Sequence, residues 1–103
     1  MILHRAVFQA KFGHADAVVA GFKVMAANSF SEIPEPIRPI EMRILTDLSG
    51  EFDTVTFETV HHSLASYEQF RKLLFSSAEF ADEQSQGMDL IVSGRNEFYT
   101  IES

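Results

Sequence analysis

The chain of 103 residues contains no cysteine and no tryptophan. Without cysteine it has no disulfide framework, no thiol nucleophile and no thiolate ligand for a metal. Its first residues, Met1–Val7, lack the long apolar run of a signal peptide, and no stretch is long enough to span a bilayer. We therefore expect a cytoplasmic protein without a membrane partner.

Positive charge is also scarce. Eight Lys and Arg residues face fifteen Asp and Glu residues, which gives a net charge of −7. Such a chain repels phosphate backbones, so we expect no nucleic-acid partner. Hydrophobic residues make up 46% of the chain and ten residues are Phe, which is enough for one core. The length and the absence of repeats or linkers predict a single domain over residues 1–103.

The hydrophobic period changes along the chain. Residues 2–11 alternate as in a strand, and from Ala15 the apolar residues recur with the period of a helix. Three prolines within residues 34–39 exclude a helix there and predict a loop. A turn is expected at residues 47–51, with Gly50 at positive φ. The other expected elements are strands at 40–46, 52–61 and 96–102, and helices that begin after Ser63 or Ser66 and at Ala78.

This order predicts an α+β, ferredoxin-like β-α-β-β-α-β domain. Its four-stranded antiparallel sheet should have the order 4-1-3-2, with the helices on one face. Arg43 is expected opposite Glu58, because that register pairs opposite charges. The other sheet face is too apolar to lie open to water and too polar for a core, so we expect a homodimer closed through it. The residues expected in that interface are Val7, Leu45, Glu58 and Val60.

Two of the four histidines are candidates for chemistry. His4 begins the first strand and His61 ends the third, so antiparallel pairing predicts that they are adjacent at one end of a cleft between helices and sheet. Histidine titrates near neutral pH and can move a proton, which makes this pair the candidate catalytic residues. The alternative is two strand-end histidines bonded to loop carbonyls. The predicted substrate-contacting residues in the cleft are Phe8, Phe22, Phe57 and Tyr67.

The positions of the histidines in the sequence do not predict a metal site. His61 and His62 are adjacent in a strand and point to opposite faces. His4 and His61 supply two ligands, whereas Zn²⁺ usually takes at least three from the protein. We therefore expect no metal and no cofactor. The acidic residues expected to form a solvent-exposed face are Glu79, Asp82, Glu83 and Asp89.

Four segments resemble the dimeric α/β-barrel superfamily. Met1–His4 resembles the opening of its stress-responsive branch, and Lys11–His14 resembles the strand-to-helix turn. Thr56–Tyr67 resembles the third strand running into the second helix, and Ser77–Phe80 resembles the short helix that follows. The resemblance implies a homodimer in which two sheets close a barrel. It leaves the stress-responsive, antibiotic-biosynthesis-monooxygenase-like and NIPSNAP-like branches open, and these differ in function.

The monooxygenase branches carry residues that this chain lacks. They typically have a Trp two positions before the helix-capping Ser, where this chain has His61, and often an Asn in the first strand, where it has Ala6. The haem-degrading branch uses a His in a region where residues 80–84 contain none. We therefore expect no oxidative haem degradation.

Two classes of function stay open at this point. The first is a homodimer that binds a small apolar or aromatic molecule in the cleft, either as a binding protein or as a cofactor-independent enzyme of monooxygenase or isomerase type. The second is a non-catalytic dimeric module with a stress-related or interaction role. The sequence does not separate them, and it leaves open whether the protein is an enzyme.

Overall fold

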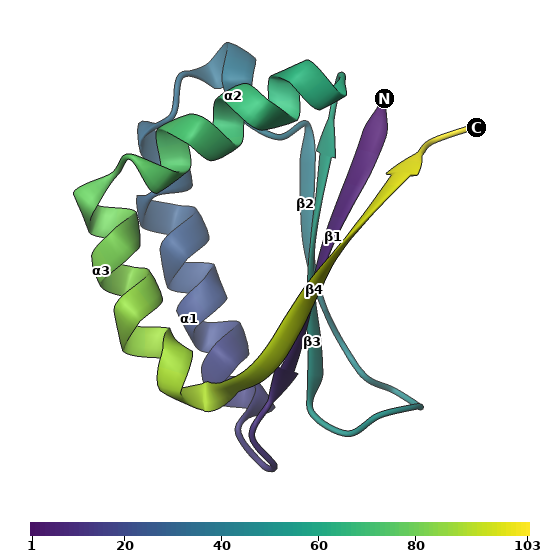
Figure 1. The fold of residues 1–103 in the computed structure, drawn as a ribbon, viewed down its shortest axis with the longest axis vertical. Helices are drawn as coiled ribbons and strands as arrows, with labels where there is room; N and C mark the ends of the chain where they lie inside the picture. The colour runs from purple at the N-terminus through teal and green to yellow at the C-terminus, as the bar shows by residue number, and fades with distance from the viewer.

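A computed structural model of the chain shows strands and helices alternating as expected (Figure 1). It describes the backbone of residues 1–103 and the side chains of all residues except 85, 86 and 88. The elements are β1 (Ile2–Ala10), α1 (Ala15–Asn28), β2 (Glu41–Thr46), β3 (Thr54–His61), α2 (Leu64–Phe75), α3 (Ala78–Gly87) and β4 (Ile91–Thr100). Short 3₁₀ turns cover Phe30–Glu32, Glu35–Ile37 and Met88–Leu90. Among the helices so described, none is long and apolar enough to cross a membrane.

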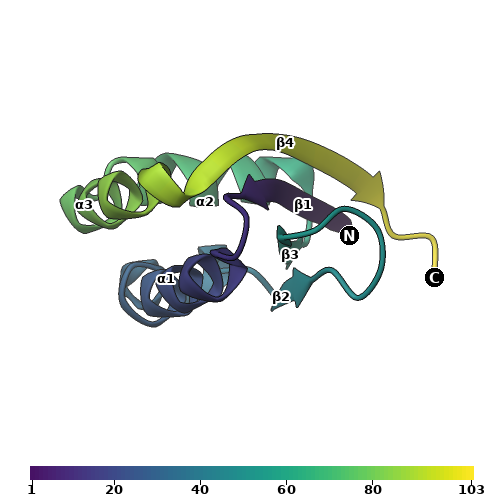
Figure 2. The ribbon, with the colours of Figure 1, turned by 90° about the horizontal axis from the view of Figure 1, so that it is seen from below.

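The strands form one antiparallel sheet in the order β2-β3-β1-β4. This is the predicted order 4-1-3-2 read from the opposite edge. All three α-helices lie on one side of the sheet, and the other side is uncovered (Figure 2). The predicted ferredoxin-like fold is therefore confirmed, with one open sheet face.

The β2–β3 pairing follows the predicted charge register. Arg43 lies opposite Glu58, and Ile44 lies opposite Phe57 on the helix-facing side. The connecting loop is longer than predicted, because β3 begins at Thr54 rather than at residue 52. Gly50 has the expected positive φ of 102°, and Asp53 also adopts a positive φ, of 59°, just before the strand starts.

The predicted β1–β3 register is wrong by two residues. His4 pairs with Thr59, and His61 pairs instead with Ile2. The physical reason lies on the open face, where this register puts Arg5 directly opposite Glu58. The predicted register, with His4 opposite His61, would have lost this pairing of opposite charges. The pairing therefore favours the observed register. A slip of two keeps every side chain on its own face, so the helix-facing assignment still holds.

The last strand begins five residues earlier than predicted, at Ile91 rather than Asn96. Gly94 lies within β4, opposite Phe8. A Cβ at Gly94 would lie 3.0 Å from Cδ1 of the Phe8 ring, so the missing side chain makes room for that ring. Glycine in a strand interior often marks such a close approach.

The start of α2, which the sequence left open, is set by Ser63. Its hydroxyl oxygen accepts a hydrogen bond from the backbone N–H of Ser66 at 3.2 Å. This satisfies one of the free N–H groups in the first turn, so the helix begins at Leu64. β3 ends at His61, two residues before this cap, so the connection between β3 and α2 is short.

The core lies between the helices and the sheet. Its aromatic rings pack edge to face, as between Phe30 and Phe70, whose centroids are 5.0 Å apart at 88°. Val55 of β3 is fully buried beneath α1. The larger cluster of buried residues comprises Phe30, Ile33, Phe57, Phe70, Leu74 and Phe80.

Candidate functional site: a helix–sheet cavity

A cavity of about 460 Å³ lies between the helices and the sheet. Residues from α1, α2, α3, β1, β3 and β4 line it, and most of them are apolar. The four aromatic residues predicted to line a cleft here do so: Phe8, Phe22, Phe57 and Tyr67. Their place in the wall is confirmed, and their contact with a substrate stays a prediction.

The alternation of β1 and β3 explains why these rings meet. Phe8 and Phe57 both point to the helix side, and Phe22 comes down from α1 between them. The centroid of Phe22 lies 5.2 Å from that of Phe8 and 5.5 Å from that of Phe57. Tilted and edge-on contacts of this kind hold aromatic rings in fixed orientations. The wall is therefore built from rings locked by one another.

His4 lies at one end of the cavity. Its Nε2 donates a hydrogen bond to Oδ1 of Asn96 at 2.8 Å, and its ring stacks on Phe98 at 4.8 Å between centroids. Burial lowers the pKa of His4, and the charge of Arg71 lowers it further, against the opposing effect of the Asn96 hydrogen bond. At neutral pH His4 is therefore an uncharged imidazole. Since Nε2 carries the proton, Nδ1 carries a lone pair that can accept one.

His61 does not line the cavity. It is 1% exposed, and its Nε2 shares a hydrogen bond with the hydroxyl of Thr59 at 2.8 Å, while Nδ1 is buried and has no partner in the described part of the chain. Burial, reinforced by the charge of His4, lowers the pKa of His61 to about 4. Both histidine rings pack against Tyr67. The centroid of the Tyr67 ring lies 4.8 Å from that of His4 and 5.2 Å from that of His61. The two are thus neighbours on one face, but only His4 reaches the cavity.

Arg71 was missed by the sequence reasoning. It lines the same end of the cavity, with its guanidinium carbon 4.5 Å from the centroid of the Phe75 ring. Burial raises the pKa of Tyr67, and the positive charge of Arg71 opposes that rise, so the guanidinium is close to the phenol. The signal was present in the spacing, because Arg71 follows Tyr67 by four residues and such pairs share a helix face.

Glu83 is the second omission, and here the prediction was wrong. It was expected on a solvent-exposed acidic face, but it lines the cavity from α3. Its Oε1 accepts a hydrogen bond at 3.1 Å from the hydroxyl of Ser29, a residue that is 2% exposed. Its Oε2 is buried and has no hydrogen-bond partner among the residues whose side chains are described. The reason lies in packing, because α3 turns this carboxylate toward the end of α1 and away from water.

The positions that differ from the monooxygenase branches also belong to this region. Ala6, where those branches often have Asn, lines the cavity, whereas His61, at their Trp position, lies behind Tyr67. The stretch without His contributes Phe80, Glu83 and Gln84 to the wall. Among the side chains that the structure describes, no three His, Asp or Glu residues gather where they could hold a metal ion.

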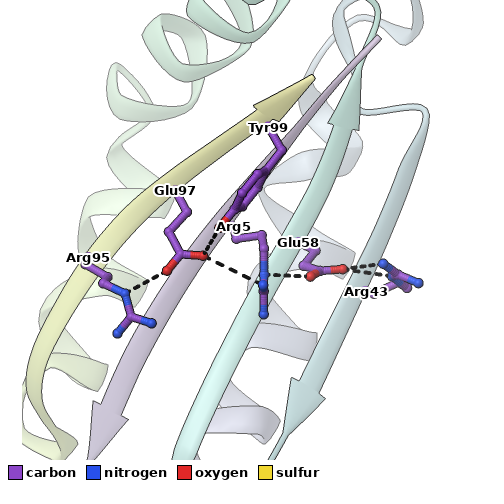
Figure 3. Close-up of polar contacts among 6 residues, drawn as sticks. All are labelled: Arg5, Arg43, Glu58, Arg95, Glu97 and Tyr99. Carbon is purple, nitrogen blue, oxygen red and sulfur yellow. Dashed lines mark hydrogen bonds and ion pairs between the residues drawn. The ribbon is translucent and has the colours of Figure 1, made fainter. Parts of the chain in front are cut away.

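The open sheet face carries a row of alternating charges that crosses all four strands (Figure 3). Glu58 is 5% exposed and lies between two arginines, 2.9 Å from Nε of Arg5 and 3.0 Å from Nε of Arg43. Arg5 also approaches Glu97 at 3.7 Å, and Glu97 binds Nε of Arg95 at 2.8 Å. The hydrogen bond from Arg95 lowers the pKa of Glu97, with a second contribution from Tyr99.

The fold and the one-sided helices define a ferredoxin-like domain. No protein-family model and no curated protein matches the chain. Solved structures do match it. A NIPSNAP domain protein from Burkholderia xenovorans superposes with a TM-score of 0.84 at 10% identity, covering 100% of this chain and 96% of its own.

Two further solved structures also share the fold at low sequence identity. The protein Atu4242 from Agrobacterium tumefaciens has a TM-score of 0.82 at 14% identity, covering 97% of this chain and 92% of its own. A candidate antibiotic biosynthesis monooxygenase from Nitrosomonas europaea has a TM-score of 0.73 at 10% identity, covering 100% of both chains. The chain thus shares the fold of NIPSNAP and antibiotic-biosynthesis-monooxygenase-like proteins, which confirms the resemblance at the level of fold.

Proposed function

We propose that this protein, a single domain over residues 1–103, is a homodimer that binds a small apolar or aromatic molecule in the helix–sheet cavity. The observation that carries the proposal is the cavity of about 460 Å³, with aromatic walls and His4 at one end. Ligand pockets typically measure about 300–1,000 Å³ and are mostly apolar with a few convergent polar groups. The candidate monooxygenase among the solved neighbours supports a small organic molecule as the ligand.

The dimer is proposed from the open face. Leu45 is 37% exposed there, while Glu58 is nearly buried within the row of charges. A surface that mixes apolar side chains with already paired charges suits a sheet-on-sheet interface, because association would desolvate no unpaired carboxylate of the row. The partner we propose is a second copy of this chain, as in the superfamily that the sequence resembles.

The catalytic form of this proposal is a cofactor-independent, isomerase- or monooxygenase-like reaction in which His4 takes a proton from the bound molecule. Its uncharged ring offers Nδ1 as the acceptor, and Asn96 orients the ring through Nε2. His61 would act as a positioning residue, since it packs behind Tyr67 and does not line the cavity.

A second candidate is a non-catalytic binding or interaction module. The observation that favours it is the position of His61, because half of the expected histidine pair is sealed away from any ligand. This candidate keeps the dimer and removes the proton transfer. A substrate whose turnover is abolished by His4→Gln, with ligand binding retained, would separate the two candidates in favour of the enzyme.

Binding is tested with N-phenyl-1-naphthylamine, a neutral aromatic probe whose fluorescence rises in apolar surroundings. Gly21 lines the cavity and has open space where its Cβ would lie, so Gly21→Leu should fill the cavity and weaken binding at least tenfold. The matched control is Val24→Leu on the same helix, since Val24 is 52% exposed. Absence of binding to the wild type, or equal binding to both variants, would contradict the proposal.

Dimerisation is tested by light scattering. The wild type should have twice the 11.6 kDa mass of the chain. Leu45→Asp on the open face should shift the mass toward that of one chain, whereas the control Val24→Asp should not. A wild-type mass near 11.6 kDa at every concentration would exclude the dimer.

A further inference from the structure

The cavity contains a buried acceptor that no described residue uses. Oε2 of Glu83 is buried and has no hydrogen-bond partner among the described side chains, while Oε1 of the same carboxylate binds Ser29. A buried carboxylate oxygen is normally paired, because leaving it unpaired forfeits its hydration with nothing in return. Glu83 lines the cavity, so a ligand there can supply the missing donor.

The cavity also has a cationic end. Arg71 comes from α2 and lies beside His4 and Tyr67, whose pKa values both respond to its charge. Among the described side chains, Arg71 makes no ion pair with a carboxylate, Glu83 included. Burial raises the pKa of Tyr67, and a hydrogen bond from Arg71 also opposes that rise, so part of the guanidinium is engaged by the phenol. Since a guanidinium carries five N–H donors in a planar fork, the remaining donors can meet a planar anion such as a carboxylate.

The remaining wall of the cavity is largely aromatic. Phe57 and Phe70 belong to the buried core beside the cavity, and Phe22 meets Phe57 edge-on. Such rings favour a flat apolar body over a flexible polar one, since stacked and edge-on contacts add to the burial of area. The cavity therefore suits a ligand with three parts: an anion for Arg71, a flat apolar body for the aromatic rings, and a hydrogen-bond donor for Glu83.

We propose that the cavity binds an aromatic molecule with a carboxylate at one end and an O–H or N–H donor at the other. The carboxylate would meet Arg71, and the donor would meet Oε2 of Glu83. This inference rests on the proposed function, because it names the class of molecule bound in the same cavity. The inference goes beyond the proposed function because it requires the ligand to carry both polar groups.

The test compares ligands that differ by one group, using isothermal titration calorimetry at neutral pH. The complete probes are 6-hydroxy-2-naphthoate and the longer 4′-hydroxybiphenyl-4-carboxylate. Each is matched by an analogue without the hydroxyl, 2-naphthoate or biphenyl-4-carboxylate, and by one without the carboxylate, 2-naphthol or 4-phenylphenol. At least one complete probe should bind on the order of tenfold more tightly than both of its analogues.

Variants assign each preference to its residue. Glu83→Gln should remove the advantage of the hydroxyl, and Arg71→Gln should remove the advantage of the carboxylate. The matched controls are Glu79→Gln on α3 and Lys72→Gln on α2, because both side chains are exposed and neither lines the cavity. Circular dichroism establishes that each variant is folded, and the comparison of probes on the wild type needs no variant.

The outcomes separate this inference from the function on which it rests. Equal affinities within each set of three ligands, with N-phenyl-1-naphthylamine still bound, would overturn the inference and leave an apolar binding site. A preference that persists in both Glu83→Gln and Arg71→Gln would also overturn it. Failure of every probe, N-phenyl-1-naphthylamine included, would remove the proposed function and the inference with it.

Discussion

Acidification is expected to destabilise this protein through His61. Burial and the charge of His4 lower the pKa of its ring from 6.5 to about 4 in the folded protein. In the unfolded chain the ring takes up its proton near the ordinary value of about 6.5. Between these two pH values the unfolded state binds a proton that the folded state does not. The free energy of unfolding therefore falls as the pH falls through this interval.

The magnitude follows from the width of the interval. At about 1.36 kcal/mol for each pKa unit, the complete loss is roughly 3.4 kcal/mol, of which about 2.6 kcal/mol has been lost at pH 4.5. Because the ring is 1% exposed, solvent screening removes little of this effect. The pH dependence due to His61 fades about one unit above pH 6.5 and about one unit below pH 4.

The assay is urea unfolding at pH 7 and pH 4.5, at one fixed protein concentration, for the wild type, His61→Gln and His62→Gln. His62 is the exposed neighbour of His61, so its variant controls for the loss of a histidine as such. The wild type and His62→Gln should lose stability in parallel. His61→Gln should lose about 2.4 kcal/mol less over the same interval, because about 0.2 kcal/mol of the 2.6 kcal/mol has already been lost at pH 7. Equal losses in all three proteins would refute the burial of a neutral ring at this position.

Three further predictions concern packing, charge and activity. Gly94→Ala should destabilise by about 1–3 kcal/mol in thermal unfolding, because its Cβ would press on the Phe8 ring, whereas Gly21→Ala, with open space and a helical position, should stabilise by up to about 1 kcal/mol. Glu58→Gln should cost about 2 kcal/mol in urea unfolding, after allowance for its partly exposed arginine partners, while Glu41→Gln on the exposed part of β2 should change stability by less than about 0.5 kcal/mol. Purified protein incubated with haemin and a reductant should leave the Soret band at the level of a protein-free control, and its loss with a bilin-like or iron-releasing product would contradict the comparison with the haem-degrading branch.

Alternation along the strands was enough to predict the fold and the two sheet faces. It assigned Ile44 and Phe57 to the helix side, and the pairing of Arg43 with Glu58 aligned β2 with β3. The same rule does not distinguish registers that differ by two residues, because both keep every side chain on its face. For β1 the difference came from Arg5, whose contact with Glu58 joins two neighbouring strands that lie far apart in the sequence.

The candidate site was predicted in part for similar reasons. The aromatic residues that line the cavity follow from local period, which is a property of single strands and helices. Glu83 follows from how α3 packs on the end of α1, where Ser29 turns one carboxylate oxygen inward. An exposed acidic helix and a half-buried one have the same local pattern, so tertiary packing alone distinguishes them. Gly94 was missed likewise, since only Phe8 on the next strand explains it.

The two faces of the sheet are linked through β1. Arg5 on the open face aligns this strand with β3 through Glu58, and His4, its neighbour in the chain, therefore lies opposite Thr59 on the helix face. That alignment leaves His61 to the hydroxyl of Thr59. The β1–β4 register, in which Arg5 lies opposite Glu97, brings Nε2 of His4 to Asn96. A slip of two residues would instead set the two imidazoles opposite each other. The charges that we propose lie in the dimer interface thus also determine which histidine reaches the cavity.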